Sequence, residues 1–271
     1  MIEAADGLAT PAAAADLYMT KPMASGLTGE VCLFVSFAEQ PALKPHVTDH
    51  ICHLLASGIH VVLVVNTDIP PSSIRIEAGL YDRLSGIMIR RNLGFDFGAW
   101  AHALSLCDAR ENWTRLYLVN DSIVGPLSGA DFVRMMGRVR NAGADVVGLT
   151  ESLTPRRHLQ SYFLVFNESA LRSHVFKALF RRILNWPRKE QVIDIYEARI
   201  TALLEAEGMQ CQALFPSLWN DTLSSDDTSV RWAELVAAGF PYLKARVVAG
   251  NPRDKRIDTW LAARPGIPPA D

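Results

Sequence analysis

Residues 31–37 carry the sequence Val-Cys-Leu-Phe-Val-Ser-Phe, a nearly continuous apolar run with the length of one β-strand. A strand that is apolar at consecutive positions suits a sheet that is covered on both faces. Comparable apolar runs occur at 61–65, 87–89, 116–119, 146–149 and 162–166. Apolar residues at helical spacing lie between several of these runs, as at Val47, Ile51 and Leu54. This alternation predicts an α/β fold: a doubly wound, mostly parallel sheet flanked by helices.

The chain beyond residue 166 is expected to be mainly helical. Helical patterns cover 169–186 and 189–207, and Gly208 is placed to end the second one. Residues 213–215 are expected to return to the sheet, and a further helical stretch covers 232–238. We therefore predict a helical C-terminal part. Residues 1–30, of Ala, Gly, Thr and Pro character, predict a loosely ordered lead-in to a single domain over residues 31–271.

Composition excludes several classes of protein. The 27 basic residues face 29 acidic ones, so no broad basic field for nucleic acid is expected. The longest clean apolar run, 31–38, is far shorter than the roughly 20 residues of a membrane span. Glu3 and Asp6 stand where a signal peptide would carry Lys or Arg. We expect a soluble, cytoplasmic protein.

The first polar cluster, Arg91-Asn-Leu-Gly-Phe-Asp-Phe-Gly98, directly follows the third predicted strand and opens a helix. Ligands of doubly wound sheets bind at the carboxyl ends of the strands. Gly94 permits a tight turn, Asn92 and Asp96 offer hydrogen-bonding groups, and the helix N-terminus offers free N–H groups to an anion. A compatible alternative is that Asp96 only caps this helix.

The second polar cluster, Asn120-Asp121-Ser122, ends the fourth predicted strand. A carboxylate at the end of a buried strand is well placed to hold Mg²⁺ or Mn²⁺, which prefer oxygen ligands and often share them with substrate phosphates. The alternative is an Asx-turn, in which the Asp121 side chain accepts hydrogen bonds from nearby backbone N–H groups.

Several segments, taken together and in order, resemble the rhamnan synthesis F family, a group of GT-A-like glycosyltransferase domains of bacterial surface-polysaccharide assembly. They lie in the chain between Val31 and Pro252. The matching segments are Arg91-Asn-Leu-Gly-Phe-Asp-Phe-Gly-Ala-Trp100, Leu118-Val-Asn-Asp-Ser-Ile-Val-Gly-Pro126, Leu159-Gln-Ser-Tyr-Phe-Leu-Val-Phe166, Tyr196-Glu197 with Thr201, and Trp232 through Gly239-Phe-Pro-Tyr-Leu-Lys244.

The resemblance implies a GT-A-like fold, a nucleotide-sugar donor such as dTDP-rhamnose, and transfer of the sugar to a surface polysaccharide or a lipid-linked glycan. The residues expected at the donor are Arg91, Asn92, Gly94, Asp96, Asn120, Asp121 and Ser122, with Asp121 as the metal ligand. The chain departs from the family of metal-dependent GT-A enzymes at Asn120-Asp121-Ser122, because their Asp-x-Asp has two carboxylates. Dependence on Mg²⁺ or Mn²⁺ is therefore left open.

The resemblance also implies a catalytic base. Inverting GT-A enzymes often carry a Glu-Asp pair that opens a helix, and this helix ends in Gly about eleven residues later and precedes a strand. Glu197 stands at the matching offset from Gly208. An inverting transfer needs a carboxylate that accepts the proton of the acceptor hydroxyl. The alternative is a solvated helix carboxylate paired with a nearby Lys or Arg.

Other polar residues are assigned to the acceptor side or to solvent. His158 and Gln160 flank the sixth strand, and they are placed with Glu151 on the acceptor side. Lys244 and Arg246 could reach a diphosphate, but isolated basic residues are usually solvated. Residues 169–186 combine an apolar stripe with basic side chains, which is typical either of weak contact with an anionic membrane surface or of a helix that packs on the sheet.

Two other functions compete with a transferase. A non-catalytic module that binds nucleotide sugars or glycans is kept open by Ser122, which stands where a second carboxylate is usual. A phosphate-ester hydrolase or nucleotidyltransferase would use the same Asp121. The lack of a second acidic cluster at a neighbouring strand end counts against a two-metal version of that chemistry.

Overall fold

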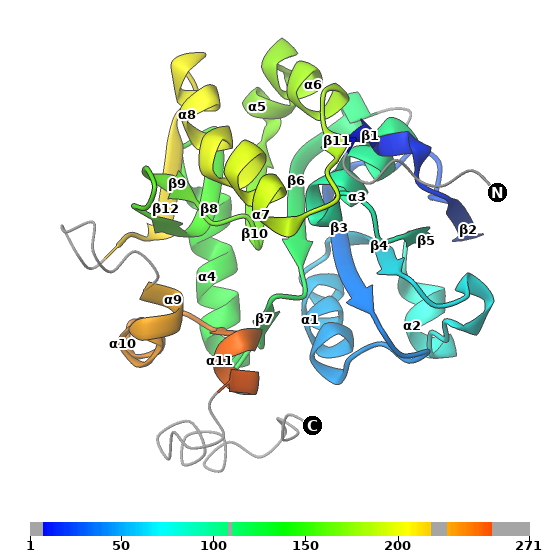
Figure 1. The fold of residues 1–271 in the computed structure, drawn as a ribbon. Helices are drawn as coiled ribbons and strands as arrows, with labels where there is room; N and C mark the ends of the chain where they lie inside the picture. Colours follow the sequence, from blue (N-terminus) through cyan, green and yellow to red (C-terminus); the bar gives the residue numbers. More distant parts are fainter. Residues whose placement is uncertain (1–7, 108–109, 218–226, 251–271) are drawn as a thin grey trace.

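The computed structural model describes residues 8–107, 110–217 and 227–250, and a nine-stranded sheet organises them (Figure 1). Its strands are β2 (Leu17–Lys21), β3 (Gly29–Ala38), β4 (His60–Thr67), β5 (Gly86–Arg91), β6 (Trp113–Asn120), β8 (Val146–Ser152), β9 (His158–Leu159), β10 (Phe163–Asn167) and β12 (Cys211–Phe215).

The strand order is β12-β8-β10-β6-β3-β4-β5-β2, and β9 pairs with β8 outside this order. The pairs β3–β4, β4–β5, β3–β6 and β8–β12 are parallel. Strand β10 is antiparallel to both β6 and β8, and β2 is antiparallel to β5. The predicted α/β fold with a mostly parallel sheet is confirmed, and β10 makes the sheet a mixed one.

Helices and short strand pairs complete the described chain. The helices are α1 (Pro45–Ala56), α2 (Ala78–Arg83), α3 (Phe95–Ser105), α4 (Gly129–Asn141), α5 (Glu168–Arg172), α6 (His174–Arg181), α7 (Lys189–Val192), α8 (Ala198–Ala206), α9 (Asp227–Val230), α10 (Trp232–Ala237) and α11 (Ala245–Gly250), with a π-helical turn at Ile193–Glu197. Strand β1 (Thr10–Pro11) pairs with β11 (Leu184–Asn185), and β7 (Ile123–Val124) pairs with β13 (Leu243–Lys244).

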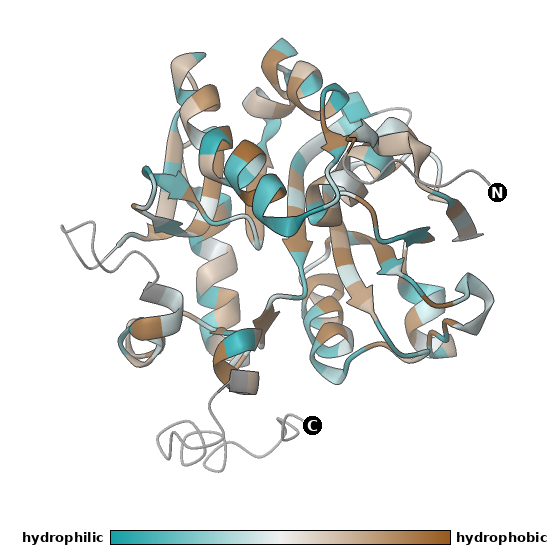
Figure 2. Ribbon diagram, viewed as in Figure 1, coloured by the Kyte–Doolittle hydropathy of each residue, from teal (hydrophilic) through white to brown (hydrophobic). Residues whose placement is uncertain are grey.

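The continuous apolar strands form two cores, one on each face of the sheet. In β3, Cys32 and Phe34 pack with the buried residues of α1 and α4, whereas Leu33 and Val35 pack with those of α3 and α6. Neighbouring side chains of a strand point to opposite faces, so both faces require apolar residues. Figure 2 shows this pattern as hydrophobic strands enclosed by helices of mixed hydropathy.

The N-terminal segment differs from the expected loosely ordered lead-in over residues 10–21. Strand β2 extends the sheet beyond β5, with Leu17 opposite Arg90, and β1 pairs with β11. The backbone N–H of Arg91 donates to the carbonyl of Asp16 at 3.0 Å. The side chains of β2 are mostly exposed, so this edge strand gains its order from ladder hydrogen bonds rather than from burial of side chains. Residues 1–7 of the lead-in lie outside the described residues.

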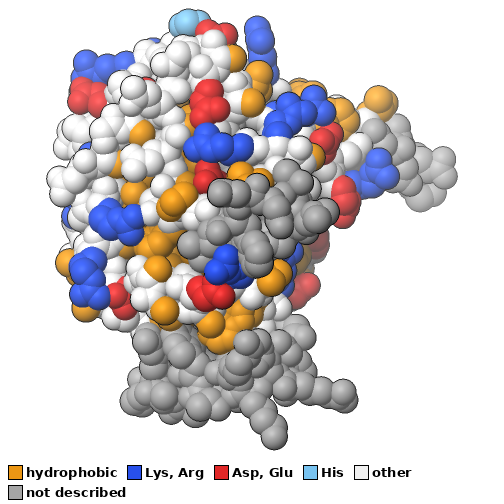
Figure 3. Space-filling view, turned by 90° about the vertical axis from the view of Figure 1, so that its left-hand side faces the viewer, with side chains coloured by type: hydrophobic (Ala, Val, Ile, Leu, Met, Phe, Trp, Pro, Cys, Tyr) orange, Lys and Arg blue, Asp and Glu red, His pale blue; other side chains and the backbone are white. Residues whose placement is uncertain are grey.

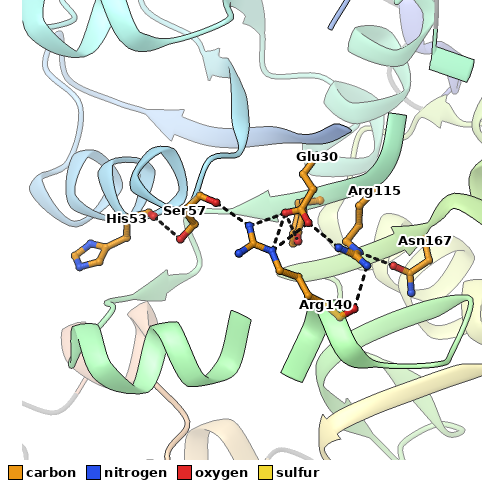
Figure 4. Close-up of polar contacts among 7 residues, drawn as sticks. Glu30, His53, Ser57, Arg115, Arg140 and Asn167 are labelled. Carbon is orange, nitrogen blue, oxygen red and sulfur yellow. Dashed lines mark hydrogen bonds and ion pairs between the residues drawn. The ribbon is translucent and has the colours of Figure 1, made fainter. Parts of the chain in front are cut away.

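An ion-pair cluster joins the sheet to α4 at the amino ends of β3 and β6 (Figure 4). The Glu30 carboxylate accepts hydrogen bonds from Arg115 at 2.6 Å, Arg140 at 2.8 Å and Tyr117 at 3.0 Å. Burial acts to raise the pKa of Glu30, but the hydrogen bonds from Arg140 and Tyr117 and the two arginine charges outweigh it and lower this pKa. Arg140 also donates to the carbonyl of Ser57 at 2.7 Å, so α1 is connected to the same cluster.

The predicted helix over 169–186 is divided into α5 and α6, because Ser173 breaks it and caps α6 by accepting a hydrogen bond from the Phe176 N–H at 3.1 Å. Phe176 and Phe180 are buried within the protein core. The apolar stripe therefore packs inside the protein, as one of the two alternatives predicted. Within the described residues, none of the helices has the length and apolar character to cross a membrane. On the face in Figure 3, basic and acidic side chains are interspersed.

Candidate functional site

A cavity of about 600 Å³ lies at the carboxyl-terminal edge of the parallel strands. Its walls include Phe37 at the end of β3, Asn66 at the end of β4, Asn92 just after β5 and Asn120 at the end of β6. In the sheet, β3 has β4, the next of its strands along the chain, on one side and β6 on its other side. The cavity thus lies at a switch point of the sheet, where ligands of doubly wound folds bind.

The remaining wall comes from segments distant in sequence. Strand β10 runs antiparallel to β6, so the residues just before it, Ser161 and Tyr162, reach the same edge. The turn of π-helix presents Ile193 and Glu197, and the end of β13 presents Lys244. The predicted site residues that line the cavity are Asn92, Asp96, Asn120, Asp121, Ser122, Gln160 and Glu197.

Asp96, Asn120 and Ser122 form a hydrogen-bonded chain along one wall. The Asn120 amide donates to Asp96 Oδ2 at 2.7 Å, and Asn120 Oδ1 accepts from the Ser122 N–H at 3.0 Å and its hydroxyl at 2.7 Å. Two of the alternatives raised by the sequence do not hold. Helix α3 has Gly94 at its N-cap without a side-chain cap, so Asp96 does not cap it, and the Asx-turn is made by Asn120 rather than by Asp121.

The Asp96 carboxyl group has a pKa far above the ordinary value for an aspartate. Burial raises its pKa to about 7, and the negative charge of Asp121 adds to the shift. The Lys189 charge and the hydrogen bond from Asn120 act in the opposite direction but do not cancel it. Asp96 therefore changes its protonation state near neutral pH, which is uncommon for an aspartate and is frequent at functional sites.

Asp121 is held by groups from β3 and from the start of α1. Its Oδ2 atom accepts hydrogen bonds from Lys44 Nζ at 2.8 Å, the Ser36 hydroxyl at 3.0 Å and the Phe37 N–H at 3.1 Å. The His46 ring lies 3.3 Å from the Asp121 carbonyl oxygen. Asp121 therefore links β6 to β3 and α1 across the switch point.

The GT-A-like resemblance implies a divalent cation at Asp121, and the residues present do not fit one. One carboxylate oxygen already has three protein donors, one of which is the Lys44 ammonium group. Nowhere in residues 8–107, 110–217 and 227–250 do three His, Cys, Asp or Glu side chains converge as a metal-binding group. Mg²⁺ is usually held by one or two carboxylates together with substrate phosphates, and here the Asp121 carboxylate is already paired with an ammonium group.

The turn before α3 is built on strained backbone. Gly94 has φ +70° and is followed by Phe95 with φ +53°, a left-handed conformation that is unusual for a bulky residue. The Asn66 amide donates to the Phe95 carbonyl at 3.2 Å and holds this turn, and Phe95 lines the cavity. Non-glycine residues in this conformation cluster at functional sites.

Gly94 and Arg91 do not line the cavity, contrary to the donor contacts expected of them. A Cβ atom on Gly94 would lie 2.6 Å from the Cα atom of Asn185, so this glycine permits close packing against β11. Arg91 is exposed and lines a separate hollow with Asp16 and Tyr18. The buried Arg90 fixes the turn instead, because its guanidinium donates to the Leu93 carbonyl at 2.8 Å and to Asn185 Oδ1 at 3.0 Å.

Glu197 ends the π-helical turn and points to the cavity from the side opposite the strands. Its Oε1 atom accepts a hydrogen bond from the Ser161 N–H at 3.2 Å. Among the described residues, Glu197 forms no ion pair. The alternative of a helix carboxylate paired with a nearby Lys or Arg is therefore not observed. Single π-helical turns are rare and are frequently found at functional sites.

Four cationic side chains line the cavity in positions that the sequence does not reveal: Lys44, Lys189, Lys244 and Arg246. Pairing of Lys244 with Ile123 in β13 and β7 places the last two next to Ser122. We expected Lys244 and Arg246 to be solvated. Lys244 is instead half-buried because of this long-range strand pairing, whereas Arg246 is exposed and also lines the cavity. Burial lowers the pKa of Lys244 to about 8, opposed by the charge of Glu197.

The three residues expected on the acceptor side are divided. Gln160 lines the cavity and accepts a hydrogen bond from the Thr150 hydroxyl at 2.6 Å. Glu151 lies outside the cavity lining and pairs with Arg157 at 2.8 Å. His158 is buried in β9, where its ring lies 2.8 Å from the Arg156 carbonyl, and it too is absent from the lining.

The chain is similar in sequence to known proteins. Virulence protein VirA of Vibrio anguillarum is 25% identical over 225 residues, which cover 71% of this chain and 70% of that protein. The uncharacterized protein y4gN of Sinorhizobium fredii is 30% identical over 169 residues, or 60% of this chain and 43% of that protein. Residues 61–260 match the family described as rhamnan synthesis protein F, which associates the chain with polysaccharide synthesis. The chain belongs to the rhamnan synthesis protein F family.

Proposed function

We propose that the protein is a GT-A-like glycosyltransferase that moves a sugar from a nucleotide-diphosphate donor to a bacterial surface polysaccharide or a lipid-linked glycan. The observation that carries this proposal is the composition of the cavity at the switch point of the sheet. Three carboxylates, Asp96, Asp121 and Glu197, and four cationic side chains border one volume of about 600 Å³. Such a volume suits a sugar nucleotide, with cations for its phosphates and a carboxylate for the acceptor.

The donor diphosphate is assigned to the cationic side. Lys44 and Lys244 flank Asp121 and Ser122, and Arg246 follows on the same segment. The hydrogen-bonding groups of Asn92, Asp96, Asn120 and Ser122 are assigned to the hydroxyl groups of the sugar or nucleotide. Family membership supports a rhamnose donor such as dTDP-rhamnose.

The base is assigned to Glu197, and the transfer is proposed to invert the anomeric centre. The Ser161 N–H fixes one carboxylate oxygen, and the other is left to accept the proton of the acceptor hydroxyl. As this proton leaves, the acceptor oxygen forms a bond to the anomeric carbon. The bond from that carbon to the phosphate oxygen breaks, and its electron pair leaves with the nucleoside diphosphate.

The location follows from the substrates. A nucleotide-sugar donor and a growing glycan place the reaction in the cytoplasm, with a lipid-linked acceptor presented at the inner membrane face. The exposed basic side chains Arg181 and Arg182 at the end of α6 are assigned to weak contact with anionic lipid, although the apolar stripe beside them is largely buried. No nucleic-acid partner is proposed.

The test measures nucleoside diphosphate release from dTDP-rhamnose and other nucleotide sugars by the purified protein, with and without glycan acceptors. We expect turnover that falls roughly 10²-fold or more in Glu197→Gln, because the amide cannot accept the proton. The matched control is Glu207→Gln, which changes an exposed glutamate beyond the end of α8. Tight donor binding without turnover under any condition would instead identify a non-catalytic module.

A further inference from the structure

Asp121, which directly follows β6, forms an ion pair with Lys44. Lys44 Nζ lies 2.8 Å from Asp121 Oδ2, and the same oxygen accepts hydrogen bonds from the Ser36 hydroxyl and the Phe37 N–H. The Asp121 side chain is 13% exposed, so this arrangement is largely shielded from water. A divalent cation on that oxygen would have to displace or lie beside the ammonium group, and charge repulsion opposes both.

A second carboxylate for a cation is not available nearby. The Asp96 carboxyl group is already engaged, because its Oδ2 atom accepts a hydrogen bond from the Asn120 amide at 2.7 Å. Ser122 offers a hydroxyl group that is already donated to Asn120 Oδ1. Oxygen atoms that are already engaged in hydrogen bonds within the protein are poor ligands for a hard cation, which needs free anionic or carbonyl oxygens.

Lys44 is also open to the cavity. Its side chain is 42% exposed and lines the space in which the donor is proposed to bind. An ammonium group has three N–H donors, and Asp121 uses one of them. Lys44 is held at both its side chain and its backbone. Its ammonium group donates to Asp121, and its backbone carbonyl accepts a hydrogen bond from the Val47 N–H at 3.0 Å in the first turn of α1.

We propose that Lys44, oriented by Asp121, replaces the divalent cation of the site and stabilises the departing nucleoside diphosphate in a metal-independent transfer. This inference rests on the proposed function. When the bond between the anomeric carbon and the phosphate oxygen breaks, its electron pair stays on the diphosphate. The remaining N–H donors of Lys44 meet that added charge, while Asp121 keeps the ammonium group in place.

The experiment has two parts that use the full-length chain after treatment with EDTA and passage over a chelating resin. The first is calorimetric titration with dTDP, UDP and GDP, in buffer alone and with added Mg²⁺ or Mn²⁺. The second is turnover of the nucleotide sugar under the same conditions. The variants are Lys44→Met, the charge-conserving Lys44→Arg, and the control Lys177→Met, which changes an exposed lysine on α6.

We expect a nucleoside diphosphate to bind the metal-free protein, with less than a twofold change on adding either cation. Lys44→Met should weaken this binding at least tenfold and lower turnover by roughly 10²-fold, the usual loss for one charge-stabilising group. Lys44→Arg should recover part of both, and Lys177→Met should leave both unchanged. Thermal melting identifies any variant that has lost its fold. If Lys44→Met is unfolded, nucleotide binding and turnover of Lys44→Arg test the proposal in its place.

Three results overturn the proposal in distinguishable ways. Binding and turnover that vanish on chelation and return with Mg²⁺ or Mn²⁺ would show a metal-dependent transferase, so the proposed function would stand without this inference. A folded Lys44→Met protein with normal binding and turnover would remove Lys44 from the site. Failure of every nucleoside diphosphate to bind with or without metal would reject this inference together with the proposed donor site.

Discussion

Replacing Asp96 with asparagine should make the protein more stable at neutral pH. The side chain is partly buried, and its pKa of about 7 lies well above the ordinary value of 3.8. Asparagine keeps an oxygen that can accept the hydrogen bond from the Asn120 amide, and it carries no charge into the cavity. The variant therefore removes the cost of a buried carboxylate without removing its partner.

The size of the effect follows from the two pKa values. A carboxyl group whose pKa is raised in the folded state binds its proton more tightly there than in the unfolded chain, so stability falls as pH rises between the two values. Each pKa unit is worth 1.36 kcal/mol, which gives about 4 kcal/mol for a complete shift. Because Asp96 keeps some contact with water, we expect the variant to gain roughly 2–4 kcal/mol at pH 7.5 and almost nothing at pH 4.

Urea unfolding of both proteins at intervals from pH 4 to pH 8 measures this gain. Asp82→Asn serves as the control, since Asp82 is exposed on α2. The difference between Asp96→Asn and wild type should grow through this range and level off above pH 7. A constant difference, or a variant that is less stable than wild type at pH 7.5, would refute the account of Asp96 as a desolvated acid.

Three further predictions test the packing and the charge of the molecule. Glu30→Gln leaves Arg115 and Arg140 without a carboxylate. Because the cluster is only partly buried, the substitution should lower the free energy of unfolding in urea by roughly 2–3 kcal/mol. A loss below about 0.5 kcal/mol, which is that of an ordinary surface change, would contradict this prediction. Gly94→Ala should cost about 1–3 kcal/mol of stability, because of backbone strain and the clash with Asn185. Its control, Gly137→Ala in the open middle of α4, should stabilise the protein by about 0.5–1 kcal/mol. Equal effects of the two substitutions would show that the turn at Gly94 is not constrained. Affinity for dTDP should fall between pH 6.5 and pH 9, because Asp96 gains its negative charge and Lys244 loses its positive charge in this range. Calorimetry of Lys244→Met should show a weaker decline on the alkaline side. A decline equal to that of wild type would show that Lys244 is remote from the phosphates.

The sequence contains enough information for the sheet and for part of the site. The buried strands were predictable because a strand covered on both faces must be apolar at consecutive positions, as at residues 31–37. Polar residues at the ends of β5 and β6 were predictable as a group because parallel strands bring their carboxyl ends to one edge. Asn92, Asp96 and Asn120 line the cavity for that reason.

Contacts that depend on pairing between distant segments were not predictable. Lys244 reaches the cavity only because β13 pairs with β7, and Lys44 only because the start of α1 lies over the end of β6. Local patterns do not contain such pairings. The choice of Asn120 rather than Asp121 for the Asx-turn also depends on Lys44, which occupies the Asp121 carboxylate and leaves the turn to its neighbour.

A crystal structure of the protein with dTDP tests the central claim most directly, because the claim is that the cavity at the switch point binds a nucleotide-sugar donor. We predict electron density for the nucleotide in this cavity, with a diphosphate oxygen within hydrogen-bond distance of Lys44 Nζ and the other phosphate facing Lys244. The claim would be contradicted by a nucleotide bound elsewhere, such as in the hollow lined by Tyr18 and Arg91, while the cavity bordered by Asp121 and Glu197 holds only water.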